Sequence, residues 1–286
     1  MDSSPLAERL PPMRLRARDY LLSRQSPEGG FCAYRGYYVE EPNLADTWRG
    51  VSAWRLLTGE ALPQRDRHAA FLARTGIAPQ AISLYQRVRA FQALRRADPS
   101  PAQVRDAVAA LPLSLPQGPV PSLQAPLRQL RQTLWLKRHF GLDDTQADEA
   151  AVDFLRQWQA GNGGYGRPPN LHDTAEALAL LHACRASPDQ ACAGFVRRVE
   201  LRAFGFRLTA ASLSPSLETT CAGLNCCVYL GIVPRYADDA ARFIVNCQAG
   251  SGGFALRPDA KPGLDLTYLA LCTLGRSGYL GTASTP

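Results

Sequence analysis

Three seven-residue segments decide the fold: Gln25-Ser-Pro-Glu-Gly-Gly-Phe31, Gln159-Ala-Gly-Asn-Gly-Gly-Tyr165 and Gln248-Ala-Gly-Ser-Gly-Gly-Phe254. Each reads glutamine, three variable residues, two glycines and an aromatic residue. A helix-like apolar pattern precedes each copy, and after a loop a threonine opens a second apolar run, at Thr47, Thr174 and Thr267. This order indicates an internal repeat of helix, glycine turn, loop and helix.

A weaker fourth copy lies at 195–231, where Glu200 stands for the glutamine and Thr220 opens the second run. Two further units, 71–94 and 104–141, keep helical periodicity but have no glycine turn. Six units of about 48 residues each have the size of a two-helix repeat. Patterns of alternating apolar residues are nearly absent, so we predict an all-α fold of about twelve helices.

The glycine pairs have a structural role that needs no ligand. Glycine allows positive φ where the first helix ends, and the following aromatic residue can pack back on the helix pair. Residues 161–166 also fit the GxGxxG pattern of dinucleotide-binding loops, but a helix pattern precedes them instead of a strand. We therefore predict no nucleotide site.

The composition is that of an ordinary globular protein: 286 residues, 46% hydrophobic, 20% charged, with a formal charge of +7. No apolar run reaches the roughly 18 residues of a membrane helix, and we expect a soluble, cytoplasmic protein. The eight cysteines form no CxxC pair and are expected to be reduced. Arginines are mixed with acidic residues, so we expect no nucleic-acid partner, whereas a small anionic ligand is compatible with the positive excess.

The stretch FIVNCQAGSGGFALRPDAKPGLDLTYLAL at 243–271 resembles the repeat of protein prenyltransferase β subunits and of terpenoid cyclases of the squalene–hopene type. The resemblance implies an α6–α6 toroid, or α/α barrel, which we place as a single domain at 15–278. Flexible tails are expected at 1–14 and 279–286. In such a toroid the second helix of each unit belongs to the inner ring, and the loops before these helices surround the mouth of a central apolar cavity.

The resemblance points to the residues just before each helix-opening threonine as a shared rim. The predicted catalytic residues, acting by acid/base chemistry, are Asp46, His172, Asp173, Glu218 and Asp265. An aspartate at a helix start commonly caps the helix, so for Asp46 and Asp173 a capping role stays open beside a catalytic one. His172 beside Asp173 is a pair that could carry a proton.

The second helices supply the predicted lining of the cavity: Trp48, Trp54, Tyr85, Tyr268 and Cys221. Aromatic faces stabilise carbocations, and they also simply fill a core, so both roles stay open. Of the other histidines, we place His182 deeper along the helix of His172, and we expect His68 and His139 at the surface.

Zinc-dependent protein prenylation in this family uses an Asp-x-Cys pair in one repeat and a histidine in the next. The corresponding positions are Thr219, Cys221 and Leu266, so only the cysteine is kept and we predict no metal and no cofactor. Cyclases of the family instead use DxDD, whose middle aspartate donates a proton. Here the corresponding segments, 170–173 and 263–266, keep one acid each, Asp173 and Asp265. Burial in an apolar cavity raises the pKa of a carboxylic acid. The acid then stays protonated and can donate a proton.

The sequence therefore predicts an enzyme that acts on an isoprenoid-like apolar substrate, with or without a diphosphate, in the cavity of a toroid. Its reaction would be cyclisation, isomerisation or prenyl transfer to a small acceptor, and not zinc-dependent protein prenylation. Two alternatives stay open: a non-catalytic binding or scaffold protein, and a β-like subunit that works with an α-type partner. The stretch 99–126, rich in proline and leucine, is the expected contact of such a partner.

Overall fold

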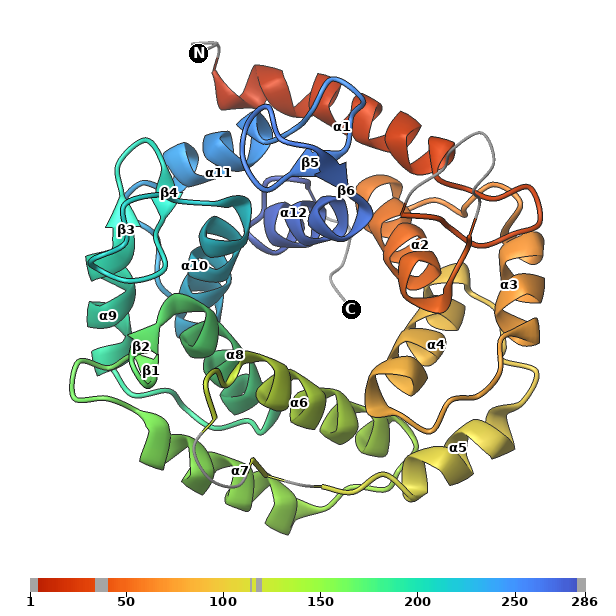
Figure 1. Cartoon of the computed structure of the whole chain (residues 1–286), viewed down its shortest axis with the longest axis horizontal. Helices are drawn as coiled ribbons and strands as arrows, with labels where there is room; N and C mark the ends of the chain where they lie inside the picture. The colour runs from red at the N-terminus through yellow and green to blue at the C-terminus, as the bar shows by residue number, and fades with distance from the viewer. Residues whose placement is uncertain (1–4, 34–40, 114, 117–119, 282–286) are drawn as a thin grey trace. The chain divides into compact units, whose positions relative to one another are not determined.

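The computed structural model describes residues 5–33, 41–113, 115–116 and 120–281. These residues form twelve α-helices, two for each of the six units that the sequence predicts (Figure 1). The helices are α1 (Leu6–Ser23), α2 (Leu44–Thr58), α3 (Arg65–Arg74), α4 (Ala81–Leu94), α5 (Pro101–Ala109), α6 (Gln124–His139), α7 (Thr145–Trp158), α8 (Leu171–Ala183), α9 (Ala191–Val199), α10 (Leu217–Leu230), α11 (Ala237–Asn246) and α12 (Leu264–Arg276).

The ends of the chain differ from the predicted tails. Helix α1 begins at Leu6, and Met13 within it is fully buried, so residues 6–14 are helical instead of forming a flexible tail. Burial of Met13 and its neighbours against the protein stabilises this first part of the helix. Leu280 in the predicted C-terminal tail is also buried. Residues 1–4 and 282–286 of the two predicted tails lie outside the described residues.

The chain divides into two compact units, which are described separately. Unit 1 comprises 1–78, 86–102 and 241–286, and unit 2 comprises 79–85 and 103–240. In unit 1, helix α2 packs against α12 and α1. In unit 2, helix α8 packs against both α6 and α10. The second helices of different repeats therefore contact one another, as the two-helix repeat predicts.

Short antiparallel hairpins, which the sequence did not predict, accompany the glycine turns. They pair β1 (Tyr165–Gly166) with β2 (Pro169–Asn170), β3 (Glu200–Leu201) with β4 (Gly205–Phe206), and β5 (Phe254–Ala255) with β6 (Pro262–Gly263). The first residue of the turn also pairs with its aromatic residue in all four repeats: Gln25 with Phe31, Gln159 with Tyr165, Glu200 with Phe206, and Gln248 with Phe254. Four repeats thus share one turn structure, including the weak copy at 195–231.

The threonine of each of these repeats links the glycine turn to the second helix. In the first repeat, the hydroxyl of Thr47 accepts a hydrogen bond from the backbone N–H of Phe31 at 3.0 Å and donates one to the carbonyl of Asn43 at 2.6 Å. Thr174 and Thr267 make the same pair of bonds with their own turns. A buried hydroxyl with both bonds made explains why this position is threonine.

The aromatic residue of the turn packs on a small residue three positions after the threonine. A Cβ atom on Gly50 would lie 2.3 Å from the ring of Phe31, and one on Gly223 would lie 2.1 Å from Phe206. The corresponding residues in the other two repeats are Ala177 and Ala270, both fully buried. The aromatic ring therefore fills the space that a small residue leaves on the second helix.

The first glycine of the turn lies against the first helix of the next repeat. At Gly29, where φ is +96°, a Cβ atom would come within 2.4 Å of the carbonyl of Arg67 in α3. Gly252 of the sixth repeat has the same conformation and lies against the carbonyl of Arg16 in α1. The last repeat thus packs on the first helix of the chain as the first repeat packs on α3. None of the helices in the described part of the chain is long and apolar enough to cross a membrane.

Candidate functional site

Asparagine residues, and not the predicted aspartates, cap helices α2 and α8. The side chain of Asn43 accepts the backbone N–H of Asp46 at 2.9 Å, and that of Asn170 accepts the backbone N–H of Asp173 at 3.0 Å. Asp46 and Asp173 lie three residues further on, in the first turn of each helix. The prediction that they occupy the cap position is therefore wrong, because an asparagine three residues earlier already supplies the cap.

The carboxylate of Asp46 is held by donors within unit 1. It accepts hydrogen bonds from the side chain of Asn43 at 2.7 Å and from the backbone N–H of Ala33 at 3.1 Å, and it pairs with Arg49 at 3.2 Å. Only 6% of Asp46 is exposed. These contacts give Asp46 a structural role, tying the segment before α2 to the start of that helix.

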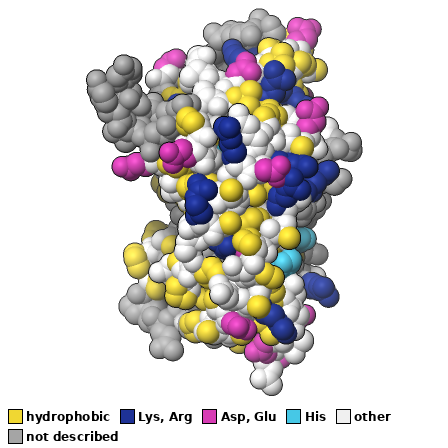
Figure 2. Space-filling model, turned by 90° about the vertical axis from the view of Figure 1, so that its right-hand side faces the viewer, with side chains coloured by type: hydrophobic (Ala, Val, Ile, Leu, Met, Phe, Trp, Pro, Cys, Tyr) yellow, Lys and Arg dark blue, Asp and Glu magenta, His cyan; other side chains and the backbone are white. Residues whose placement is uncertain are grey.

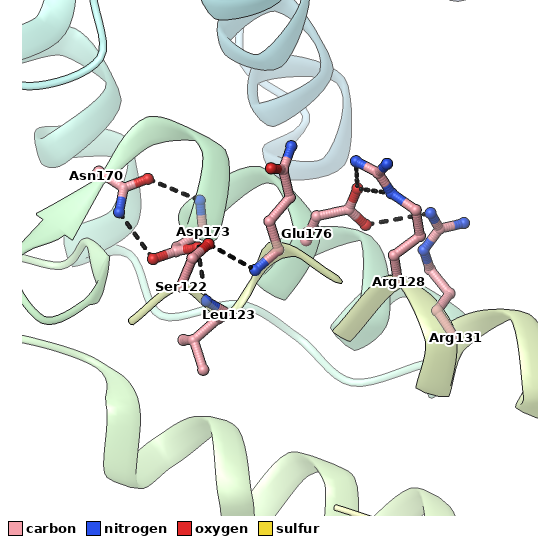
Figure 3. Close-up of polar contacts among 8 residues, drawn as sticks. Ser122, Leu123, Arg128, Arg131, Asn170, Asp173 and Glu176 are labelled. Carbon is pink, nitrogen blue, oxygen red and sulfur yellow. Dashed lines mark hydrogen bonds and ion pairs between the residues drawn. The ribbon is translucent and has the colours of Figure 1, made fainter. Parts of the chain in front are cut away.

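The carboxylate of Asp173 has the same kind of role in unit 2 (Figure 3). One of its oxygens accepts from the hydroxyl of Ser122 at 2.8 Å and from the backbone N–H of Leu123 at 2.9 Å. The other accepts from the side chain of Asn170 at 2.7 Å. Both oxygens therefore act as acceptors within the fold, and they join the start of α6 to the start of α8.

Glu218 and Asp265 occupy the second position of helices α10 and α12, and both are exposed. Glu218 makes no hydrogen bond or ion pair with any other described residue. Asp265 folds back over Gly263, where a Cβ atom would lie 2.3 Å from its carboxylate. A carboxylate at this position is favourable next to the positive end of the helix dipole. Only Glu218 lies in the same unit as His172.

His172 is half-buried at the start of α8, and neither of its ring nitrogens has a hydrogen-bond partner among the described residues. Burial lowers the pKa of its imidazole below the ordinary 6.5. The carboxylates of Glu218, Asp173 and Glu176 oppose this shift, and the guanidinium of Arg128 adds to it. Since burial prevails, His172 is neutral at pH 7 and one ring nitrogen offers a lone pair.

An ion-pair cluster that the sequence did not predict lies beside His172. Glu176 on α8 pairs with Arg128 at 2.8 Å and with Arg131 at 3.2 Å, both on α6 (Figure 3). Burial, the largest single effect, opposes the charge of Arg131, but the carboxylate of Glu176 together with Tyr229 and Tyr85 raises the pKa of the guanidinium. The Nε atom of Arg131 is buried without a hydrogen-bond partner in the described structure. In the sequence, a signal for this cluster is the spacing of Arg128 and Arg131, which lie three residues apart on one helix face.

The predicted site residues thus divide between the units. Unit 2 brings His172, Asp173 and Glu218 together, since both acidic side chains act electrostatically on the imidazole. Asp46 and Asp265 belong to unit 1. The convergence of all five residues on one rim stays a prediction.

The predicted cavity-lining residues also fall in both units. In unit 1, Trp48 of α2 and Tyr268 of α12 meet edge to face, with ring centroids 4.9 Å apart, and Trp54 is buried. In unit 2, Tyr85 meets Trp135 of α6 edge to face at 5.0 Å, and Cys221 is fully buried. That these side chains line a cavity stays a prediction.

The remaining histidines differ from expectation at one position. His68, expected at the surface, is buried: its Nδ1 accepts the backbone N–H of Gly30 at 2.9 Å and its ring lies over Phe31 at 5.2 Å. The glycine turn of the first repeat needs this acceptor, which explains the burial. Burial lowers the pKa of His68 to about 4. His139 is exposed as predicted, and His182, expected deeper in the cavity, is exposed too.

The donor set at the family's zinc position does not fit zinc. Thr219 uses its hydroxyl in the capping box of α10 and donates it to the carbonyl of Phe206 at 2.7 Å, and Leu266 has no ligating atom. Cys221 alone offers the soft ligand that zinc prefers. Across the described residues, no group of three or more His, Cys, Asp or Glu side chains is arranged to hold a metal ion.

The face drawn in Figure 2 carries side chains of both charges. Lys and Arg side chains lie there among acidic and apolar ones. All eight cysteines are in the thiol form, and burial raises the pKa of those whose shift is resolved, Cys226 among them. Protonated, buried thiols of this kind are packing residues.

The prenyltransferase alpha-alpha toroid domain is the family whose profile matches this chain, at residues 9–81 and 132–283. The match includes helices of both units and confirms the predicted α/α toroid of two-helix repeats. No curated protein sequence matches the chain.

Solved structures of two kinds of enzyme are similar to the chain. The protein geranylgeranyltransferase-I of Candida albicans, complexed with GGPP, has a TM-score of 0.60 at 13% identity, covering 82% of this chain and 84% of that one. A variant of the type II terpene cyclase MstE from Scytonema, in complex with geranylgeranyl dihydroxybenzoate, has a TM-score of 0.61 at 14% identity, covering 96% and 98%. The apo form of MstE gives 0.59 at 14% identity, covering 95% and 97%. At these identities the similarity shows the fold.

Proposed function

The chain belongs to the family of prenyltransferase alpha-alpha toroid domains, and on this premise we propose that it is an enzyme that holds an isoprenoid-like apolar substrate and moves a proton through His172. Two similar structures, of a prenyltransferase and of a terpene cyclase, contain a geranylgeranyl compound. That shared chemistry supports an isoprenoid chain as the substrate.

The observation that carries the proposal is the state of His172. Its imidazole is neutral, half-buried and without a hydrogen-bond partner among the described residues, in contrast to Asp46 and Asp173, whose oxygens are occupied. A neutral imidazole near physiological pH is an effective general base. Glu218, whose carboxylate favours the charged form of this ring, would stabilise the imidazolium that forms when the base takes a proton.

The same base serves each reaction that the sequence leaves open. In cyclisation or isomerisation, His172 would remove the proton next to a carbocation, and the electrons of that C–H bond would form the double bond of the product. In prenyl transfer, it would take the proton of the acceptor as the new bond forms. The roles of Asp265 as an acid and of the aromatic pair Trp48 and Tyr268 in stabilising a carbocation stay predictions.

The experiment compares wild type with His172→Ala on C10 to C20 prenyl alcohols, hydrocarbons and diphosphates, each with and without a small phenolic acceptor, with products identified by mass spectrometry. The matched control is His139→Gln, which changes an exposed histidine on α6. Products from wild type and the control, but not from His172→Ala, would support the proposal. Equal turnover by all three proteins would refute the role of His172.

A non-catalytic binding protein is the second candidate, and the structural roles of Asp46 and Asp173 favour it, because two of the five predicted acid/base residues are tied up in the fold. This candidate predicts binding of isoprenoids without turnover in the same experiment.

A β-like subunit with an α-type partner is the third candidate. The predicted contact 99–126 contains α5 and the buried residues Leu111 and Leu123, while residues 114 and 117–119 lie outside the described part. Copurification with a helical partner protein of the same source would support it.

A further inference from the structure

We propose that the β3–β4 turn of unit 2 docks on an anionic lipid surface. The proposal concerns a part of the protein that the reaction at His172 does not use, so it is independent of the proposed function. It comes from a comparison of the four turns of the repeats, in which the first residue of the turn pairs with the aromatic residue six positions later.

The β3–β4 turn has a phenylalanine where the other three turns have a glycine. The pairing of Glu200 with Phe206 gives Phe204 the position that glycine has in the other turns: Gly29, Gly163 and Gly252. A Cβ atom on any of these glycines would lie between 2.1 and 2.4 Å from a backbone carbonyl oxygen of another helix. A side chain at this position therefore has to point away from that helix, and Phe204 is 45% exposed.

The backbone of this turn differs from that of the other turns in a way that presents Phe204 to solvent. Positive φ occurs at its two neighbours, Ala203 at +66° and Gly205 at +83°, instead of at the position of Phe204 itself. The backbone N–H of Ala203 donates to the carboxylate of Asp239 on α11 at 3.0 Å. The turn is thus fixed with a large aromatic side chain directed outward, and exposed apolar side chains of this kind mark interaction surfaces.

Further exposed apolar residues and an excess of arginine accompany Phe204. The backbone N–H of Tyr236 donates to Glu200 at 2.8 Å, which holds the exposed Tyr236 and the segment of the exposed Val233 beside the turn. Segment 197–207 contains four arginines and one acidic residue, and Arg235 precedes Tyr236. Three of these five arginines are exposed: Arg198, Arg202 and Arg235. The nearby carboxylates number three, and two of them accept backbone N–H groups: Glu200, Asp238 and Asp239.

An anionic lipid surface fits this combination better than a protein partner does. A stable protein–protein interface takes about 20 to 30 residues from each side, whereas this surface offers a few apolar side chains around one turn. An aromatic ring that enters the boundary between headgroups and acyl chains needs no complementary groove. Each arginine near an anionic membrane surface strengthens binding about fivefold, so the positive excess around the turn supplies the rest of the attraction.

Cosedimentation of the full chain with lipid vesicles tests the proposal. The vesicles contain phosphatidylcholine alone or phosphatidylcholine with phosphatidylserine. We expect binding to the anionic vesicles to be at least about tenfold tighter than to the neutral ones, and to weaken as salt is added, because salt screens the attraction.

Two variants give the β3–β4 turn residues that the other turns already have, so both should fold. Phe204→Gly restores the glycine of the three other turns and should weaken binding to anionic vesicles about tenfold. Arg202→Gly introduces the residue found at Gly161 and Gly250 and should weaken it about fivefold. The matched controls change exposed residues elsewhere in unit 2, Ile82→Ala on α4 and Arg105→Gln on α5, and should leave binding nearly unchanged.

Equal binding to neutral and anionic vesicles, or full binding by a folded Phe204→Gly, would overturn the proposal. Binding of polyglutamate without binding to anionic vesicles would also overturn it, in favour of an acidic protein partner. Should Phe204→Gly unfold, Arg202→Gly decides the matter, because its binding would have to match that of Arg105→Gln if the turn had no role. A wild type that binds the vesicles but forms no product would contradict the proposed function and leave this proposal standing.

Discussion

The segments 43–47 and 170–174 read Asn-Leu-Ala-Asp-Thr and Asn-Leu-His-Asp-Thr, and they differ at one residue. Both begin a second helix with an asparagine cap, and in both the asparagine side chain donates to the aspartate at 2.7 Å. Both threonines accept the N–H of an aromatic residue at 3.0 Å. The shared residues are therefore structural, and the difference, Ala45 against His172, lies at the residue that we propose for the chemistry.

The largest expected effect comes from erasing that difference. His172→Ala converts segment 170–174 into the sequence of 43–47. We expect product formation to fall by about a thousandfold, within the range for loss of a general base, while the melting temperature changes little because the imidazole has no hydrogen bond to lose within the described structure. Unfolding of the variant under the assay conditions would instead show that the role of His172 is in packing.

A second comparison sets His172 against His68, since burial lowers the pKa of both. In the unfolded chain the imidazole of His68 gains a proton near pH 6.5, and in the folded protein only near pH 4. The stabilising contribution of the neutral ring is therefore complete above pH 6.5 and is lost as the pH falls toward 4, by roughly 3 kcal/mol in total. Urea unfolding of wild type and His68→Gln across this pH range measures it. The prediction fails if both proteins lose stability equally.

Replacing Asp173 or Asp46 should destabilise the protein, and the two losses should differ only in size. We expect Asp173→Ala to lower the free energy of unfolding by roughly 3 kcal/mol and Asp46→Ala by roughly 2 kcal/mol, because each leaves buried donors unpaired. The larger value belongs to Asp173, which is 1% exposed against 6% for Asp46. Urea titration at pH 7 measures both losses. If Asp173→Ala kept full stability and lost activity, the structural role assigned to it would be wrong.

The smallest expected effect on stability is at Glu218. This exposed carboxylate has no hydrogen bond or ion pair within the described part of the chain, so Glu218→Gln should change the free energy of unfolding by less than about 0.5 kcal/mol. Turnover should still fall about tenfold, because the charge that stabilises a protonated His172 is removed. Thermal melting and product yield from the same preparation test both halves of this expectation.

The repeats made most of the fold predictable, because glycine, threonine and aromatic residues recur at positions that the turn requires. The sequence pattern alone could not separate Asn43 from Asp46 as the cap, since either residue type serves that role. It also could not show that His68 accepts the N–H of Gly30, a contact between residues 38 positions apart. The pairing of Glu176 with Arg128 likewise depends on the packing of α8 against α6.

The candidate site was predicted in part for the same reason. Alignment of the repeats placed His172, Asp173 and Glu218 before the second helices, and the structure brings these three together in unit 2. What the alignment of the repeats could not give is which of these residues is already hydrogen-bonded, since two of the donors to Asp173, Ser122 and Leu123, come from a different repeat.

The most direct test of the central claim, that His172 is the reactive group of a structural segment shared by two repeats, is an NMR titration of the four histidine side chains with and without geranylgeraniol. We predict that His172 titrates below pH 6.5 and that its ring resonances shift on addition of the isoprenoid, whereas the ring resonances of the exposed His139 and His182 do not shift on its addition. A His172 that titrates like an exposed histidine and is unchanged by the ligand would contradict the account.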